Sequence, residues 1–367
     1  MKSRFILLAL CLTFALASFA SVRAAADGVI PPVPENGTPK DYLKYIYTVN
    51  DLLNQKVRDI EFQAYKDGID KKSEAFTKSL KSSAKEYLIP LEKATDKALL
   101  LKDVPDEDFD KLVESKIDNI EMMVWLNDDE DAGDAQMEAF VEQLRKMNKS
   151  KAADGVEFLL LRARIEKLKS ELQTKVQAGL NEGKTYSILI KELAGDFSPI
   201  EQAIDRALLL KGISDEDYKE LIQDKSVFIM SSAEINGDNE DAIIAKMEEF
   251  AEHLRRKIGK LKFAELIEAK IFQIKVNSYV SKGNIEAFAK AAAEIDDEIE
   301  KAGKSITPAQ ADKAFWIGVM SVDQPGYKAP EGRIDKYIKA FSEADDPEVK
   351  SYANSLESVV EQMKDDK

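Results

Sequence analysis

Cysteine is almost absent from this chain of 367 residues. The one cysteine, Cys11, lies in an apolar N-terminal segment that we expect to be removed. The rest of the chain therefore has no disulfide, no thiol nucleophile, no CxxC redox pair and no thiolate metal site. An exported protein without disulfides depends on its packed core for stability, which is more typical of an extracytoplasmic bacterial protein than of a small secreted scaffold.

Histidine is equally scarce, and His253 is the single example. One histidine excludes a zinc site built on a histidine pair, and a Ser–His–Asp triad would have to use this residue. Gln143 occupies the matching position in an internal repeat, so we interpret His253 as a solvent-facing helix residue. The sequence also lacks a glycine-rich phosphate loop, a nucleophile elbow and an HExxH motif. We therefore expect no enzyme activity, no catalytic residue and no cofactor.

Basic residues are outnumbered by acidic ones, 53 against 68, which gives a formal net charge of −15. Removal of residues 1–26, which carry Lys2, Arg4 and Arg23, leaves 50 basic against 68 acidic residues, or −18. An acidic surface repels phosphate backbones and anionic lipid head groups. The charge argues against nucleic-acid and peripheral-membrane binding, and a solubilising surface on long helices explains it.

Residues 1–26 have the pattern of a secretory signal peptide. Lys2 and Arg4 precede an apolar run at 5–19, and small residues at 24–26 form a cleavage site. The apolar run is too short for a stable transmembrane helix. We predict cleavage after position 26, with positions 20 and 24 as alternatives. The expected product is a soluble protein of the bacterial periplasm or another extracytoplasmic space, without a stable membrane anchor.

An internal duplication organises the rest of the chain. Residues 90–112 and 199–221 align without a gap and are identical at 13 of 23 positions. After one inserted residue, 137–145 and 247–255 are identical at six of nine positions. Self-similarity on this scale predicts structural units packed side by side.

Apolar residues recur at spacings of three and four, and no window alternates long enough to predict a strand. We therefore predict an all-α fold of antiparallel helix pairs in a duplicated repeat array. The expected parts are the signal peptide, a mobile proline-rich spacer, two repeat units and a divergent third unit, at residues 1–26, 27–37, 38–153, 154–282 and 283–367.

Four prolines are predicted to open helices. Pro39 follows Thr38, and Pro308 follows Thr307, so each has a hydroxyl N-cap before it. Pro199 follows Ser198 in the same way. Because Pro90 is its counterpart in the first copy, we predict that a helix starts at Pro90 as well.

One acidic segment has a calcium-loop spacing. Four residues occupy positions 1, 3, 5 and 12 of an EF-hand loop: Asn127, Asp129, Asp131 and Glu138. Position 6 is Ala132 instead of the glycine that the turn requires, and position 12 of the second copy is Met247. An acidic turn that caps the next helix explains both copies, so calcium binding is the lesser alternative.

Carboxylates four residues apart recur in both copies, at Glu138 with Glu142 and at Glu248 with Glu252. Recurrence within a repeat indicates architecture, because a catalytic pair is normally present once and placed in a cleft. Three aromatic residues of the third unit, Trp316, Tyr327 and Tyr337, are the candidate partner-binding residues, with core packing as the alternative interpretation.

The repeat core resembles a helical region found in certain exported bacterial redoxin-type proteins, where it precedes a thioredoxin-like domain. The shared pattern is Ala-Leu-Leu-Leu-Lys, as at 98–102, an acidic break, a long helix, an acidic turn and a Met-x-x-Phe-x-x-x-Leu helix. It covers residues 90–165 and 199–271. This chain has no CxxC motif and no βαβ segment, so the resemblance implies the helical module alone and no redox residue.

The leading expectation is a non-enzymatic exported protein that acts as an interaction or scaffold module of the cell envelope and binds a protein or peptide. One alternative is an accessory module of a redox or protein-folding system whose catalytic domain is on another chain. The other is a carboxylate-only enzyme, such as a lyase or a glycan-active protein.

Overall fold

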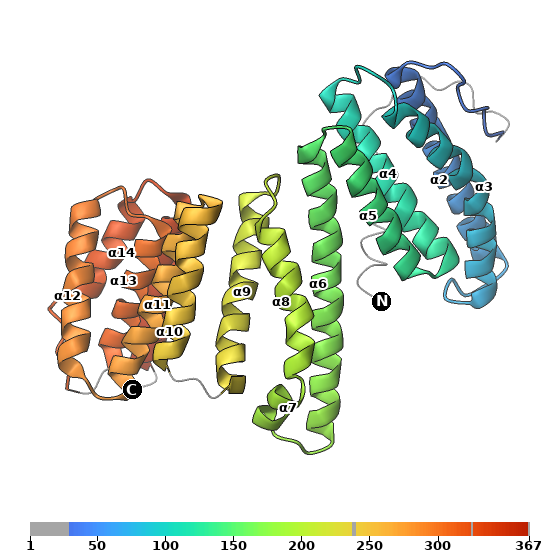
Figure 1. The fold of residues 1–367 in the computed structure, drawn as a ribbon. Helices are drawn as coiled ribbons and strands as arrows, with labels where there is room; N and C mark the ends of the chain where they lie inside the picture. Colours follow the sequence, from blue (N-terminus) through green and yellow to red (C-terminus); the bar gives the residue numbers. More distant parts are fainter. Residues whose placement is uncertain (1–28, 237–239, 324–325, 366–367) are drawn as a thin grey trace. The chain divides into compact units, whose positions relative to one another are not determined.

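The computed structural model describes residues 29–236, 240–323 and 326–365. Throughout these residues the secondary structure is helical without strands, so the predicted all-α class is confirmed. The chain divides into two compact units, Met1–Leu160 and Leu161–Lys367, and the division falls inside helix α6, Ser150–Asn181 (Figure 1). No helix that the structure describes has the length and apolar character needed to cross a membrane.

The first unit is a layer of antiparallel helices joined by short turns (Figure 1). Helix α3 packs between α2 and α4, and α5 packs on α4. A single apolar core runs through these helices, and fully buried examples are Ile46, Leu91 and Leu144. The helices are α2 (Pro39–Lys66), α3 (Glu74–Leu99), α4 (Asp106–Asn127), α5 (Glu130–Lys146) and the first part of α6 (Ser150–Asn181).

In the second unit, α13 is packed by α11, α12, α14 and α15. Its core includes Phe288, Ile317 and Phe341. A short π-helical turn, Leu254–Ile258, separates α10 from α11. The helices are α7 (Tyr186–Glu192), α8 (Ala194–Leu208), α9 (Asp215–Asn236), α10 (Glu240–His253), α11 (Leu261–Ser281), α12 (Ile285–Ala302), α13 (Pro308–Asp323), α14 (Arg333–Glu343) and α15 (Pro347–Asp365).

The predicted helix starts at Pro39 and Pro308 are confirmed. Thr38 caps α2 in a capping box: its side chain accepts from Asp41 N, and Asp41 accepts from Thr38 N at 2.8 Å. At the start of α13, Gln310 N donates to Thr307 Oγ1 at 3.3 Å, and Thr307 N donates to Gln310 Oε1 at 3.0 Å. These bonds satisfy the amide groups that the first helical turn leaves without partners.

The predicted starts at Pro90 and Pro199 are wrong, because both prolines lie inside helices. Helix α3 continues through Pro90 although a helix-interior proline loses one hydrogen bond and costs about 3 kcal/mol. Leu88 and Leu91, on either side of it, are both buried. Burying a leucine side chain is worth roughly 1.5–3 kcal/mol, so packing on both sides keeps the helix continuous.

Candidate functional site

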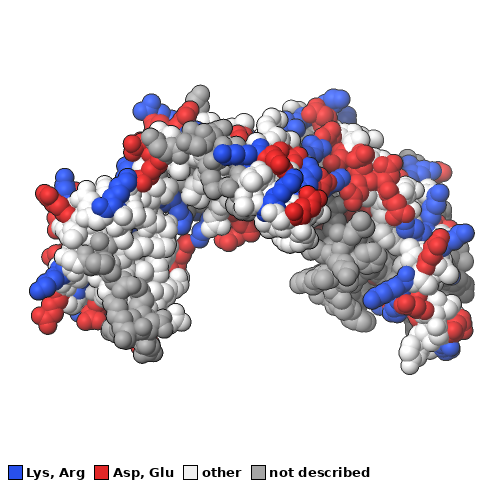
Figure 2. All heavy atoms as spheres, turned by 90° about the horizontal axis from the view of Figure 1, so that it is seen from below, with Lys and Arg blue, Asp and Glu red and all other residues white. Residues whose placement is uncertain are grey.

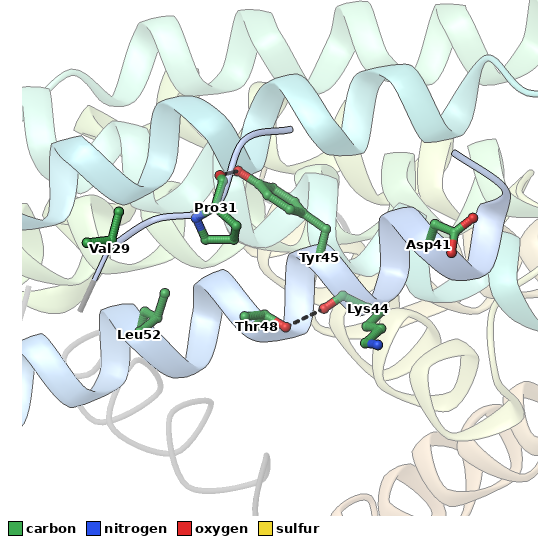
Figure 3. Close-up of a pocket in the computed structure, with 7 residues that line it drawn as sticks. All are labelled: Val29, Pro31, Asp41, Lys44, Tyr45, Thr48 and Leu52. Carbon is green, nitrogen blue, oxygen red and sulfur yellow. Dashed lines mark hydrogen bonds between the residues drawn. The ribbon is translucent and has the colours of Figure 1, made fainter. Parts of the chain in front are cut away.

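An extended N-terminal segment, residues 29–36, lies along helix α2 in the first unit (Figure 3), and we call it the strap. Ile30 and Val33 are half-buried and pack against the core of that unit. The predicted mobile spacer is therefore wrong for these residues. The physical reason is their composition, since two apolar side chains in a proline-rich segment can be buried without leaving many backbone N–H groups unsatisfied.

Two buried tyrosines of α2 hold the strap through its proline carbonyls. The hydroxyl of Tyr45 donates to Pro31 O at 3.1 Å, and the hydroxyl of Tyr42 donates to Pro34 O at 2.9 Å. Lys97 Nζ of α3 also donates to Pro34 O, at 3.4 Å. Burial raises the pKa of Tyr45, so its hydroxyl stays protonated and acts as a donor.

A shallow hollow of about 280 Å³ opens beside the strap (Figure 3). The carboxylate of Asp41 is held by Thr38, whose hydrogen bonds lower the pKa of Asp41. That carboxylate is therefore a cap and not a poised acid or base. The hollow is mostly apolar and suits a side chain of a bound peptide better than a reaction. Its lining residues are Val29, Pro31, Asp41, Lys44, Tyr45, Thr48 and Leu52.

The divergent part of the second unit contains a polar cluster. Arg333 is buried and donates from Nε and Nη2 to Asp296 of α12, with a shortest distance of 2.7 Å. It also donates to the hydroxyl of Tyr327, whose ring packs edge-on against Phe288 at 4.8 Å. Tyr337 donates to Asp296 at 2.6 Å. The cluster joins α12, α14 and the segment before α14, so it is architectural.

This cluster contains two of the three aromatic residues predicted to bind a partner. Tyr337 is only 2% exposed, so it belongs to the core and not to a docking surface. Tyr327 is half-buried and faces Arg333 and Phe288. Trp316 is half-buried and lies edge-on to Phe315 at 6.0 Å. The structure thus brings Tyr327 and Tyr337 together inside the protein, with Trp316 on a different helix.

The calcium loop predicted as the alternative is not formed. Helix α5 begins at Glu130, and Asp129 is its N-cap, accepting from Ala132 N at 3.0 Å. Asp131 and Glu138 are seven helical residues apart, which separates them by about 10 Å along the axis. Asn127, Asp129, Asp131 and Glu138 therefore do not wrap around one ion. Among the residues described, no cluster of three or more Asp, Glu, His or Cys could hold a metal.

The repeated acidic residues form the same ion pairs in both copies. Lys116 Nζ lies 3.4 Å from Glu92 and 2.8 Å from Asp96. Its counterpart Lys225 lies 2.7 Å from Glu201 and 2.8 Å from Asp205. These carboxylates therefore form ion pairs between neighbouring helices, α3 with α4 and α8 with α9. Over the face shown in Figure 2, acidic and basic side chains likewise lie side by side.

A second pair of contacts is also duplicated. Arg145 contacts Glu157 in the first copy, and Arg255 contacts Glu268 in the second. Of the acidic pairs singled out in the sequence, Glu252 contacts Arg255 at 2.9 Å, and Glu248 lies 3.4 Å from Lys275. The carboxylate-only enzyme gains no support from residues used in this way.

His253 is exposed on α10, which confirms its interpretation as a surface residue.

One apolar surface feature is duplicated as well. Leu100 follows α3 and is 69% exposed, and its counterpart Leu209 follows α8 and is 62% exposed. The preceding leucine is buried in each copy, at Leu99 and Leu208. Both exposed leucines are the C-cap residue of their helix, with φ near −85°. The duplication therefore preserves an apolar side chain in solvent.

The strap site was missed from the sequence, although a signal for it exists. The signal is Ile30-Pro31, which is followed three residues later by Val33-Pro34. A period of three is that of a polyproline II helix. Tyr42 and Tyr45 of α2 donate to the two proline carbonyls of this repeat.

Comparison of the chain with protein-family models, with curated proteins and with solved structures finds no match.

Proposed function

We propose that this protein is an exported, non-enzymatic interaction or scaffold module of the cell envelope that binds a protein or peptide. The duplicated exposed leucine carries the proposal. Although 10 of 23 aligned positions differ between the copies, Leu100 and Leu209 keep the same residue type and the same exposure. A leucine in solvent contributes nothing to the core, and its burial in an interface is worth roughly 1.5–3 kcal/mol.

The use of the repeated charges supports the same function. Lys116 and Lys225 hold equivalent pairs of carboxylates, so the repeated acidic residues stabilise helix pairs. In both copies, the exposed leucine at the helix end is therefore the apolar side chain that a partner can contact. The fully buried core of a protein interface is more apolar than its solvent-accessible polar rim.

The test is capture of envelope proteins by the mature chain, followed by reconstitution with the purified partner. Leu100→Ser with Leu209→Ser should weaken binding by at least tenfold, because two apolar anchors are lost. Val227→Ser is the matched control, since Val227 is exposed but is not duplicated. Equal binding by the double variant and the wild type would contradict the proposal. A thioredoxin-like partner would favour the accessory alternative.

A further inference from the structure

The strap is held by contacts that repeat every three residues. Ile30 and Val33 both pack on the core of the first unit. Pro31 O and Pro34 O both accept a tyrosine hydroxyl. An extended chain with three residues per turn presents the same side at each third position, so one face of the strap carries the apolar contacts and another the carbonyl contacts.

We infer that Tyr42, Tyr45 and Lys97 form a recognition site for proline-rich peptides, which the strap occupies within its own chain. The ligand in trans is an extended partner segment with the strap's pattern: an apolar residue followed by proline, repeated three residues later. This goes beyond the proposed function, because it concerns a surface other than the exposed leucines and names the chemistry of the partner.

The donors of the site fit proline for a physical reason. A buried tyrosine hydroxyl needs a hydrogen-bond partner, and Tyr42 and Tyr45 take carbonyl oxygens as acceptors. A proline residue offers a carbonyl without an N–H group that would have to be satisfied at the same time. Proline also restricts the unbound peptide to extended conformations, which lowers the entropy lost on binding.

The strap competes with such a peptide. It joins α2 through only a few residues, so its effective concentration at the site is on the order of millimolar. A peptide in trans therefore binds the wild-type chain weakly, and binding strengthens when the strap is weakened. The hollow beside Pro31, lined by Leu52 and Thr48, provides room for a side chain that Val29, 75% exposed, does not fill.

The experiment uses the mature full-length chain and a fluorescein-labelled peptide with the sequence of residues 28–37. Binding is measured by fluorescence anisotropy, and folding by circular dichroism. Val33→Asp weakens the strap at a packed position, and Pro32→Asp introduces the same charge at an exposed position that does not line the hollow. We expect the peptide to bind Val33→Asp at least tenfold more tightly than either the wild type or Pro32→Asp.

Two further comparisons test the site itself. Adding Tyr42→Phe or Tyr45→Phe to Val33→Asp should weaken peptide binding about fivefold each, as expected for one lost hydrogen bond. A peptide carrying aspartate in place of its own Val33 should not bind. Absence of binding to folded Val33→Asp, or equally tight binding to Pro32→Asp, would overturn the inference.

Hydrogen exchange of the wild-type chain provides a measurement that does not depend on a variant. About 5 mM peptide, above the effective concentration of the strap, should increase exchange at the amides of Ile30 and Val33 while α2 stays protected. Unchanged exchange would contradict displacement. Light scattering tests whether Val33→Asp forms dimers. If it does, and if the dimers disappear when the strap is removed, the strap of a second copy occupies the site. That result would also overturn the inference.

Discussion

The ammonium group of Lys116 on α4 lies 2.8 Å from the carboxylate of Asp96 on α3. Lys225 and Asp205 repeat this distance between α9 and α8. Each lysine side chain is about nine-tenths buried, whereas the carboxylates are more exposed. The duplication has thus preserved a contact between helices together with the sequence that makes it.

Replacement of this lysine should destabilise the unit that contains it. Lys116→Met leaves Glu92 and Asp96 facing each other without a cation, and we expect the free energy of unfolding to fall by about 1 kcal/mol. Urea unfolding followed by circular dichroism measures the change. Lys111→Met is the control, because the Lys111 side chain is 40% exposed and forms its ion pair with Glu107, which is 84% exposed. An equal decrease in the free energy of unfolding of the control would show that the duplicated ion pair contributes no more than an ordinary surface pair.

A proline-to-alanine change should have opposite effects at two positions. Pro90→Ala restores a hydrogen bond inside α3, and we expect it to stabilise the first unit by about 1–2 kcal/mol after the gain in unfolded-chain entropy. Pro39→Ala should destabilise it slightly, because proline is favoured at the first helical position. Thermal unfolding of both variants tests this. Destabilisation by Pro90→Ala would indicate that α3 needs the proline.

Two glycines of the first unit should respond differently to alanine. A Cβ atom at Gly133 would lie 2.0 Å from Val124 Cγ2, so Gly133→Ala forces α4 and α5 to shift and should cost about 1–3 kcal/mol. A Cβ atom at Gly155 in α6 meets open space. Gly155→Ala should therefore stabilise by about 0.5–1 kcal/mol. Denaturant midpoints of the pair give the comparison, and equal midpoints would contradict the packing of α5 against α4.

Alkaline pH should destabilise the second unit. Burial, then the bond to Asp296, raises the pKa of Tyr337 above its ordinary value, and burial raises the pKa values of Tyr218 and Tyr352. In the unfolded chain a tyrosine ionises near pH 10. The unfolded state then binds fewer protons than the folded one, so this stability is complete below pH 10 and is lost as the pH rises further.

The variant Tyr337→Phe should lower the free energy of unfolding by roughly 1.5–3 kcal/mol at pH 8, since a hydrogen bond to a carboxylate is lost. Above pH 10, the free energy of unfolding should decrease less steeply with pH in this variant than in the wild type. Tyr65→Phe, at an exposed position, is the control for both effects. Urea titrations at pH 8, 10 and 11 measure them, and an unchanged alkaline slope in Tyr337→Phe would refute the assignment.

Export should leave a defined N-terminus. When the full sequence is expressed in a bacterial host, the periplasmic protein should begin at Asp27, because small residues precede that position. Intact mass spectrometry and N-terminal sequencing identify the start. Replacing both basic residues of the n-region, Lys2→Ser and Arg4→Ser, should slow cleavage of the signal peptide. Recovery of the uncleaved chain in the cytoplasm alone would contradict the proposed export.

Two helix starts and the fold class follow from local signals in the sequence. The start of α2 at Pro39 and of α13 at Pro308 follows from caps three residues long, and the all-α class follows from apolar spacing. The exposed position of His253 also agreed with its polar neighbours. Hydrogen bonds at a helix terminus involve neighbours in the chain, so the sequence specifies them directly.

Which polar and aromatic groups are buried depends instead on packing between segments that are distant in the chain. Tyr337 meets Asp296 from 41 residues away, and Tyr45 meets Pro31 from 14 residues away. The continuity of α3 through Pro90 likewise depends on packing against neighbouring helices. These outcomes are set by burial and hydrogen bonding between distant segments, and such free energies exceed the local preferences that a sequence pattern records.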